Sequence, residues 1–227
     1  MNRIVEPEWL DTLPPEDPRA TASRRDLQRV NWWMGNHAIM ARALTTSRPA
    51  SPPRHITELG AGDGRFLLPV AQRISPRWPG VNVTLLDRQP AVSAETLAAF
   101  RQLGWPAETM VADVFNWPPA DGDIVIANLF LHHFEQARLT ELLGLISRRA
   151  KLFIGLEPRR ARWPLFCSHL LWVLGCNEVT RHDAVVSVRA GFSGNELSTS
   201  WPDEPGWHLT EQSAGAFGHL FIASRTE

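Results

Sequence analysis

Residues 55–66 read HITELGAGDGRF, and this segment says most about the fold. A short apolar run leads to an acidic residue, then to a turn with three glycines, and then to the start of a helical pattern. Glycine at alternate positions allows a tight bend and lets the backbone approach a ligand with no Cβ between them. The amide N–H groups and the positive dipole end of the following helix would face that turn. The stretch therefore predicts a strand, a ligand-binding turn and a helix.

The spacing of the glycines separates two classes of ligand. A dinucleotide fingerprint reads G-x-G-x-x-G/A and is followed by an acidic residue about 20 positions further on. Here Gly64 comes too early to be the third glycine of that pattern, and Glu58 precedes the turn. A pyrophosphate requires N–H donors and no nearby carboxylate, whereas a cationic ligand with an amino-acid tail can use an acidic residue beside the turn. The turn therefore disfavours NAD(P).

The pattern E-L-G-A-G-D-G at residues 58–64 resembles motif I of the class I S-adenosylmethionine-dependent methyltransferases, of the bacterial small-molecule type. The resemblance covers roughly residues 51–227. It implies S-adenosyl-L-methionine as the cofactor and a small molecule as the methyl acceptor.

Later motifs of the family fall at the expected places. An apolar run ends at Asp87, which corresponds to the carboxylate that accepts hydrogen bonds from the ribose hydroxyls. The run 110–114 is similar to the third motif, in which Asp113 and the backbone N–H of Val114 would read the adenine edge. The residues expected to bind the cofactor are Glu58, Gly60, Ala61, Gly62, Gly64, Asp87, Arg88, Asp113, Val114 and Asn128.

The rest of the chain alternates between short apolar runs and patterns of helical spacing. Buried strands between helices imply a parallel sheet covered on both faces. The expected fold is α/β: a Rossmann-like, doubly wound, mostly parallel seven-stranded sheet with an antiparallel strand from a C-terminal β-hairpin and an N-terminal helical extension. Strands are expected near residues 55–59, 81–87, 108–111, 123–128, 151–156, 207–213 and 218–224, and helices near 24–44, 64–74, 91–103, 135–149, 161–175, 182–190 and 195–199.

Two units are expected along the chain. Residues 1–50 read as an N-terminal helical extension or lid, and residues 51–227 as the methyltransferase domain, with a proline-bearing linker at 47–54. Aromatic residues at helical spacing are expected to pack in the core, to form a lid or to line the pocket. They are Trp32 and Trp33 in the extension, and Trp163, Phe166, Leu170 and Trp172 in the domain.

Composition argues against several classes of function. The chain has 227 residues, 44% of them hydrophobic and 21% charged, and a net charge of −1. No basic stripe indicates a nucleic-acid partner. No leader peptide is evident, and the most apolar window, residues 163–176, is too short to span a bilayer. We therefore expect a cytoplasmic protein. A monomer or a homodimer is expected. Cys167 and Cys176 have no metal-ligand spacing, and no metal site is expected.

Three histidines are candidates for catalysis. His132 and His133 belong to the sequence LHHF after the fourth expected strand, where the family faces the transferable methyl group. Either could act as a general base, or be a loop histidine that bonds the backbone, and adjacent residues of an extended segment cannot both face one pocket. His182 lies in the segment that roofs the substrate pocket in the family, where Asp183 could orient it or cap a helix instead. Glu157, with Arg159 and Arg160, reads as a solvated strand end, or one of the arginines could hold a substrate carboxylate by a bidentate fork.

The function indicated is methyl transfer to an oxygen or carbon of a small, aromatic or polyketide-like metabolite. Residues 128–131 read NLFL, not the D/N-P-P-Y turn of enzymes that methylate amines of nucleic acids, and they hold no cysteine nucleophile. Two alternatives stay open: a catalytically silent partner protein with the same fold, and a nicotinamide-dependent oxidoreductase. Cofactor specificity and methyl transfer would separate these three.

Overall fold

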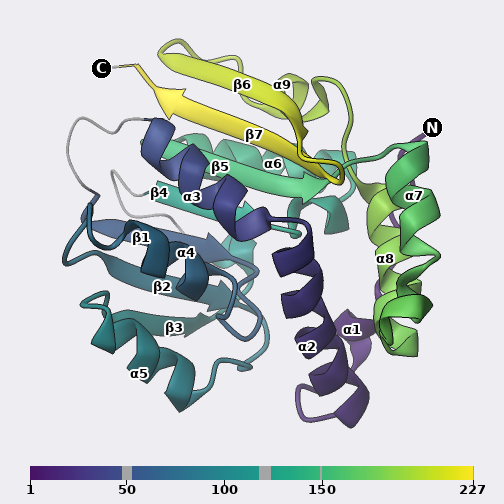
Figure 1. The fold of residues 1–227 in the computed structure, drawn as a ribbon. Coiled ribbons are helices and arrows are strands. Elements are labelled where there is room, and N and C mark those ends of the chain that lie inside the picture. Colours follow the sequence, from purple (N-terminus) through teal and green to yellow (C-terminus); the bar gives the residue numbers. More distant parts are fainter. Residues whose placement is uncertain (48–52, 118–123, 149, 227) are drawn as a thin grey trace.

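The computed structural model describes residues 1–47, 53–117, 124–148 and 150–226. In this part of the chain the strands form a seven-stranded sheet of order β3-β2-β1-β4-β5-β7-β6 (Figure 1). The first five are parallel, and β7 is antiparallel to both β5 and β6. This confirms the predicted fold. The strands are β1 (His55–Leu59), β2 (Asn82–Asp87), β3 (Ala107–Val111), β4 (Ile124–Asn128), β5 (Leu152–Pro158), β6 (Trp207–Ala214) and β7 (Gly218–Arg225).

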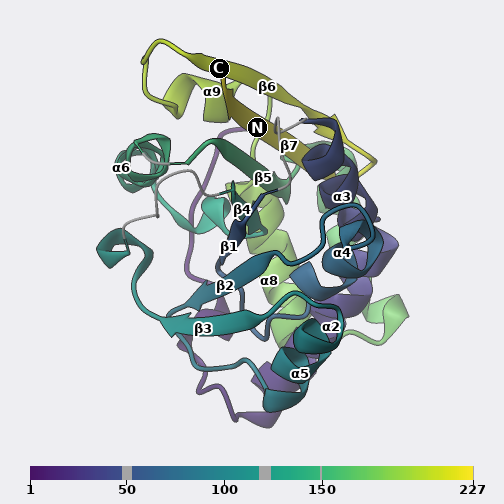
Figure 2. The same ribbon diagram turned by 90° about the vertical axis from the view of Figure 1, so that its left-hand side faces the viewer.

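The helices cover both faces of the sheet and one of its ends. Helices α3, α4 and α5 cover one face, and α6 and α9 the other (Figure 2). Helices α1, α2, α7 and α8 lie beyond the carboxyl ends of the parallel strands (Figure 1). The helices are α1 (Trp9–Thr12), α2 (Pro18–Trp33), α3 (Asn36–Thr46), α4 (Leu67–Ile74), α5 (Ala94–Gln102), α6 (Gln136–Ser147), α7 (Arg162–Ser168), α8 (Glu178–Ala190) and α9 (Glu196–Ser200), with 3-10 turns η1 (Val114–Asn116), η2 (Leu131–His133) and η3 (Leu171–Leu174).

Strand β4 shows why the apolar runs are continuous. Ile124 and Ile126 join the core under α3 and α4, whereas Val125 and Ala127 join the core under α6. Successive side chains of a strand point to opposite faces, so a central strand covered on both faces must be apolar at every position. The two cores therefore fix both the register of the sheet and the edge at which the parallel strands end.

The single helix predicted over residues 24–44 is wrong. The structure has α2 and α3 there, separated at Gly35, whose φ of 71° is left-handed. Glycine adopts this conformation without the steric cost that a Cβ brings, so the helix can end although apolar spacing continues on both sides. Helix α2 also begins earlier than predicted, at Pro18, where the Asp17 carboxylate accepts the N–H of Arg19.

The aromatic residues of α7 and η3 do not form the predicted core or pocket wall. The predicted helix over 161–175 is divided into α7 and η3, and Gly175 ends it in the left-handed region. Helical spacing places apolar residues on one face but does not say whether another element covers that face. The exposed fractions are 58% for Trp163, 56% for Phe166, 40% for Leu170, 61% for Trp172, 70% for Trp32 and 59% for Trp33.

Some predictions fall outside the described residues: the domain boundary between 50 and 51, most of the linker, the start of the fourth strand at 123 and residue 149. Within the described part, α3 packs into the core of the sheet, where Met40 and Leu44 are fully buried. A search of the same residues finds no helix with the length and apolar character needed to cross a bilayer.

Candidate functional site

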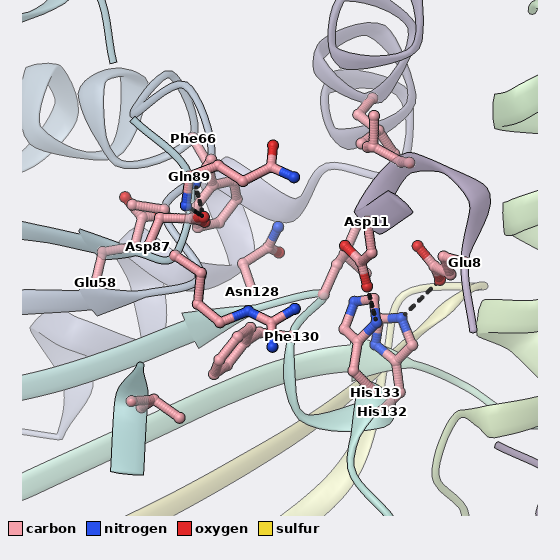
Figure 3. A pocket seen from close by; sticks show the side chains of 18 of the residues that line it. Glu8, Asp11, Glu58, Phe66, Asp87, Gln89, Asn128, Phe130, His132 and His133 are labelled. Carbon is pink, nitrogen blue, oxygen red and sulfur yellow. Dashed lines mark hydrogen bonds and ion pairs between the residues drawn. The ribbon is translucent and has the colours of Figure 1, made fainter. Parts of the chain in front are cut away.

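The carboxyl ends of β1, β2 and β4 open onto a cavity of about 640 Å³. Parallel pairing in register brings these strand ends to one edge of the sheet, where open α/β sheets bind their ligands. The side chains at this edge form two groups. Figure 3 shows the glycine-turn half, with Glu58, Asp87 and Gln89, and the histidine half, with Glu8, Asp11, His132 and His133, while Asn128 and Phe130 lie between them.

The three glycines of the turn do different things. All have left-handed φ, at 66° for Gly60, 54° for Gly62 and 73° for Gly64. A Cβ on Gly60 would lie 2.2 Å from the Phe130 ring, and one on Gly64 would lie 2.8 Å from the Leu85 side chain. A Cβ on Gly62 would meet no protein atom within 4 Å. Gly60 and Gly64 therefore admit neighbouring side chains, whereas Gly62 leaves room in the cavity; Gly64 is not among the residues that line it.

Asp87 holds the glycine turn against the end of β2. One carboxylate oxygen accepts the N–H of Gly62 at 2.8 Å, and the other accepts the N–H of Gln89 at 2.8 Å. A carboxylate can accept about four hydrogen bonds, so both oxygens keep lone pairs for hydroxyl donors in the cavity. The predicted neighbours Ala61 and Arg88 line the same half.

Glu58 is a buried acid with an unused oxygen. Its Oε2 has no hydrogen-bond partner among the described residues. Burial, followed by the charges of Asp63 and Asp87, raises the pKa of Glu58 well above its ordinary value. Such a group is costly in the free protein and suited to a cationic donor.

Replacing Glu58 with glutamine is expected to stabilise the ligand-free protein. An acid whose folded pKa is raised contributes most to stability below its ordinary pKa of 4.5, and loses that contribution as the pH rises toward the folded value. Glutamine has no proton to lose, so the gain in melting temperature should be small at pH 4 and grow toward pH 8, at about 2–4 °C per kcal/mol. Thermal melts of both proteins at several pH values test this. A variant that melts lower than the parent protein at pH 8 would contradict it.

The other predicted binding residues also reach the cavity. Asp113 caps η1 by accepting the N–H of Phe115 at 2.9 Å, and Val114 follows it. The amide of Asn128 donates to Asn31 Oδ1 at 3.1 Å. Asn31 is on α2, so the N-terminal extension contributes to the cavity wall. The sequence analysis missed Asn31, because a polar residue inside a helical pattern reads as exposed.

His132 is enclosed by two carboxylates. Its Nδ1 lies 2.8 Å from Glu157 Oε2 and its Nε2 lies 3.2 Å from Glu8 Oε1. Burial lowers its pKa, but the hydrogen bonds to Glu157 and Glu8 outweigh burial and raise the pKa to about 9. Without a ligand His132 is therefore a cation at neutral pH, which disfavours the predicted role as general base. Burial raises the pKa of Glu8, but the charge of His133, followed by the hydrogen bond and charge of His132, lowers it to about 2.

His133 lies beside it on the 3-10 turn η2. Its Nδ1 is 3.2 Å from Asp11 Oδ2, and its side chain is 22% exposed. Because the segment turns and is not extended, both adjacent histidines line the cavity, with ring centroids 4.3 Å apart. His133 is therefore the more accessible of the two candidate bases.

Glu157 is not part of a solvated strand end, as the sequence suggested. It is fully buried, and its carboxylate accepts the backbone N–H groups of Phe130, Leu131 and His132 at 3.1, 2.9 and 3.3 Å. It therefore fixes the whole turn that carries the histidines. An acid at the end of a buried strand was the available signal, but its partners were not visible in the sequence.

The structure does not bring His182 to this cavity. Its ring stacks on Trp9 with centroids 3.9 Å apart, and its Nδ1 lies 2.8 Å from Asp183. Asp183 accepts the N–H groups of Trp9 and Leu10, so it caps the short helix α1 and not its own helix. The contact of His182 with Trp9 thus accounts for its position, and its catalytic role stays a prediction.

The N-terminal segment, residues 1–13, lines part of the cavity and places Glu8 and Asp11 beside the two histidines. The Arg3 guanidinium fastens this segment by donating to the carbonyls of His132, Phe134 and Ala190 at 3.2, 2.8 and 2.7 Å. The sequence analysis found no site residue here, because nothing local to an irregular acidic segment says where it packs.

A parallel sheet with a glycine turn at β1 and an acid at the tip of β2 defines a nucleoside-binding fold of the Rossmann-like class. Comparison with known proteins shows which family this chain resembles. Residues 56–151 match the family described as methyltransferase domain. The chain is 31% identical to a phenazine O-methyltransferase of Lysobacter antibioticus, PhzM, over 76% of this chain and 52% of that protein. The chain thus spans about half the length of that relative.

Solved structures show the same fold. An O-methyltransferase family protein of Burkholderia thailandensis superposes with a TM-score of 0.62 at 19% identity, over 93% of this chain and 61% of that one. The plantazolicin methyltransferase BamL, solved with SAH, gives a TM-score of 0.65 at 12% identity, over 96% and 93%. Residues 56–151 therefore form a methyltransferase domain, and the chain is similar to the class I S-adenosylmethionine-dependent methyltransferases, a family whose cofactor is S-adenosylmethionine.

Proposed function

We propose that this protein transfers a methyl group from S-adenosylmethionine to an oxygen or carbon of a small, flat, aromatic or polyketide-like acceptor. The observation that carries the proposal is the division of one cavity into a glycine-turn half and a histidine half. The first offers the contacts that a nucleoside with an amino-acid tail requires, and the second offers aromatic walls and titratable groups. The glycine-turn half would therefore bind the cofactor, and the histidine half would bind the methyl acceptor.

The glycine-turn half fits the cofactor at three points. Asp87 has free lone pairs for the ribose hydroxyls, the unpartnered oxygen of Glu58 suits the cationic tail, and the space beside Gly62 lets the ligand approach the backbone. S-adenosylmethionine supplies an electrophilic methyl group when bound. The chain has to hold that group in line with the acceptor and keep water away, which contributes several kcal/mol to catalysis, up to about 7–11 in intramolecular models.

Aromatic side chains favour a flat acceptor. Phe130 and Phe134 line the histidine half edge to face, with centroids 5.1 Å apart, and Phe115 packs against Phe134 in the same way. Flat apolar molecules pack well between such rings. The similar phenazine O-methyltransferase bears the name of a flat heteroaromatic, which supports this class of acceptor. His133, partly exposed beside Asp11, is the residue we assign to removal of a proton from the acceptor.

A screen for methylated products tests the function. Purified protein, S-adenosylmethionine and a panel of hydroxylated aromatic compounds should yield methylated small molecules detectable by mass spectrometry. Binding of the cofactor without any product from the panel or from a metabolite extract would favour the silent partner protein. Methylated tRNA or protein in place of a small-molecule product would overturn the acceptor class, and binding of NAD(P) would favour the oxidoreductase.

Replacing Asp87 with alanine should weaken binding of S-adenosylmethionine by about 1–3 kcal/mol, the usual loss of charge-assisted hydrogen bonds. Asp87→Asn keeps one acceptor oxygen and should lose less. Glu95→Ala removes the same charge from the exposed surface of α5 and should leave the affinity unchanged. Calorimetric titration of the three variants measures the differences. Equal affinity in Asp87→Ala and Glu95→Ala would defeat the ribose assignment.

A further inference from the structure

The histidine half holds more ligand-type groups than removal of one proton requires. The donor atoms of Glu8, His132 and His133 all lie within 4.8 Å of one another. Asp11 adds a second carboxylate, 3.2 Å from His133. All four residues line the cavity, so a small ion can reach them from solvent (Figure 3). Two imidazoles and two carboxylates facing a common space are the donor set of a divalent metal site.

The spacing suits one ion. Tetrahedral zinc with bonds of about 2.0 Å to nitrogen and oxygen has neighbouring donor atoms about 3.3 Å apart. His132 Nε2 and Glu8 Oε1 are 3.2 Å apart, and His133 Nδ1 and Asp11 Oδ2 are also 3.2 Å apart. Each pair therefore already has the separation of two ligands on one metal. The 4.8 Å limit applies to Glu8, His132 and His133, whereas Asp11 lies outside that group and would join it through its contact with His133.

Neighbouring residues already hold the donor side chains in the orientation that a metal site requires. Glu157 holds Nδ1 of His132, which leaves Nε2 to face Glu8 and the cavity. Metal-binding histidines commonly have such a carboxylate on the far nitrogen, where it sets the tautomer and orients the ring. The hydroxyl of Ser187 donates a hydrogen bond to the Glu8 carboxylate. The N-terminal segment that carries Glu8 and Asp11 is fastened to the turn of the histidines by Arg3, which bonds carbonyls and leaves both carboxylates to the cavity.

We propose that Glu8, His132 and His133, with Asp11 as a fourth ligand, bind one divalent metal ion of the zinc type. The ion would lie in the histidine half, where it could polarise an acceptor oxygen and favour its deprotonated form. With His133 as a ligand, the ion would take the place of His133 in removal of the acceptor's proton. This site goes beyond the proposed function and does not rest on it, because ion binding can be measured without methyl transfer. No local pattern could indicate this site, since Glu8 and His132 are 124 positions apart.

Zinc titration of the full chain tests the proposal. Protein dialysed against a chelator should bind one equivalent of Zn²⁺ by calorimetry and retain it through gel filtration, as measured by elemental analysis. Removing even an outer-shell partner of a metal ligand costs 10–100-fold in affinity, so Glu8→Gln and His133→Ala should each lose about 100-fold or more. Zinc should also raise the melting temperature of the parent protein, and not of these variants.

The matched control is His208→Ala. His208 is exposed on β6 and does not line the cavity, so its removal should leave zinc binding unchanged. Circular dichroism confirms that each variant is folded, and the partial exposure of His133 makes its loss tolerable. The proposal is overturned if no saturable equivalent of zinc binds. It is also overturned if Glu8→Gln and His133→Ala bind zinc as the parent does, or if His208→Ala loses it equally; either result would mean an adventitious ion only, with His132 serving as the cation between Glu8 and Glu157.

Discussion

Gly62→Val should abolish detectable binding of S-adenosylmethionine while most of the fold survives. A Cβ at this position meets no protein atom within 4 Å, so the added methyl groups would enter the cavity and not the core. The cost to the fold comes from the left-handed φ of 54°, at about 1–2 kcal/mol for a residue with a Cβ. The cost to binding is steric, and we expect a loss of at least about 100-fold, or about 3 kcal/mol.

Gly80→Val separates the two costs. Gly80 also has a left-handed φ, 73°, and open space where a Cβ would lie. It precedes β2, at the amino ends of the parallel strands, and it does not line the cavity. Both variants should lose similar stability in thermal melts, and only Gly62→Val should lose the heat of binding in calorimetry. Normal affinity in Gly62→Val would place the cofactor elsewhere and remove the basis of the site.

The glycine-turn half could be predicted because its information is local. Glu58, Gly60 and Gly62 follow one another along a strand and a turn, and the meaning of each depends on its near neighbours. Asp87 is remote in sequence, but it ends the next strand of the sheet, and parallel pairing in register brings the ends of neighbouring strands to one edge. Parallel pairing alone therefore predicts that Asp87 lies beside the glycine turn.

The histidine half could not be assembled in this way. Glu8 and Asp11 belong to an irregular segment whose position is decided by its contacts with α8 and η2. No periodicity or pairing rule applies to such a segment, because tertiary packing alone places it. The same limit explains the exposed Trp163 and Trp172: spacing defines an apolar face, and the rest of the chain decides whether that face is covered.

Replacing Glu157 with alanine should destabilise the protein by about 3–5 kcal/mol, the range for breaking a buried ionic network. Its carboxylate is the common acceptor for three successive backbone N–H groups and for the His132 ring. Each buried donor left without a partner costs about 1–3 kcal/mol. Urea unfolding measures the loss. Glu141→Ala, which removes a glutamate from a half-exposed pair with Arg138, should change the free energy of unfolding by less than about 1 kcal/mol.

The backbone beside this network gives the prediction a second consequence. Leu129 has a φ of 53°, a conformation that costs a residue with a Cβ about 1–2 kcal/mol, and the bonds that Glu157 makes to the next three residues hold the chain there. Phe130 packs against Gly60, while His132 and His133 face the other half of the cavity. Relaxation of Leu129 would therefore move both halves together, and Glu157→Ala should weaken cofactor binding although Glu157 does not line the cavity.

Glu157→Gln distinguishes this positioning role from a general loss of stability. Glutamine keeps the oxygen that can accept the N–H groups of Phe130 and Leu131, but places an amide nitrogen opposite the N–H of His132. Stability and cofactor affinity should both fall between the values of the parent and of Glu157→Ala. If affinity is unchanged in both variants while stability falls, the turn is held by other contacts and Glu157 serves the fold alone.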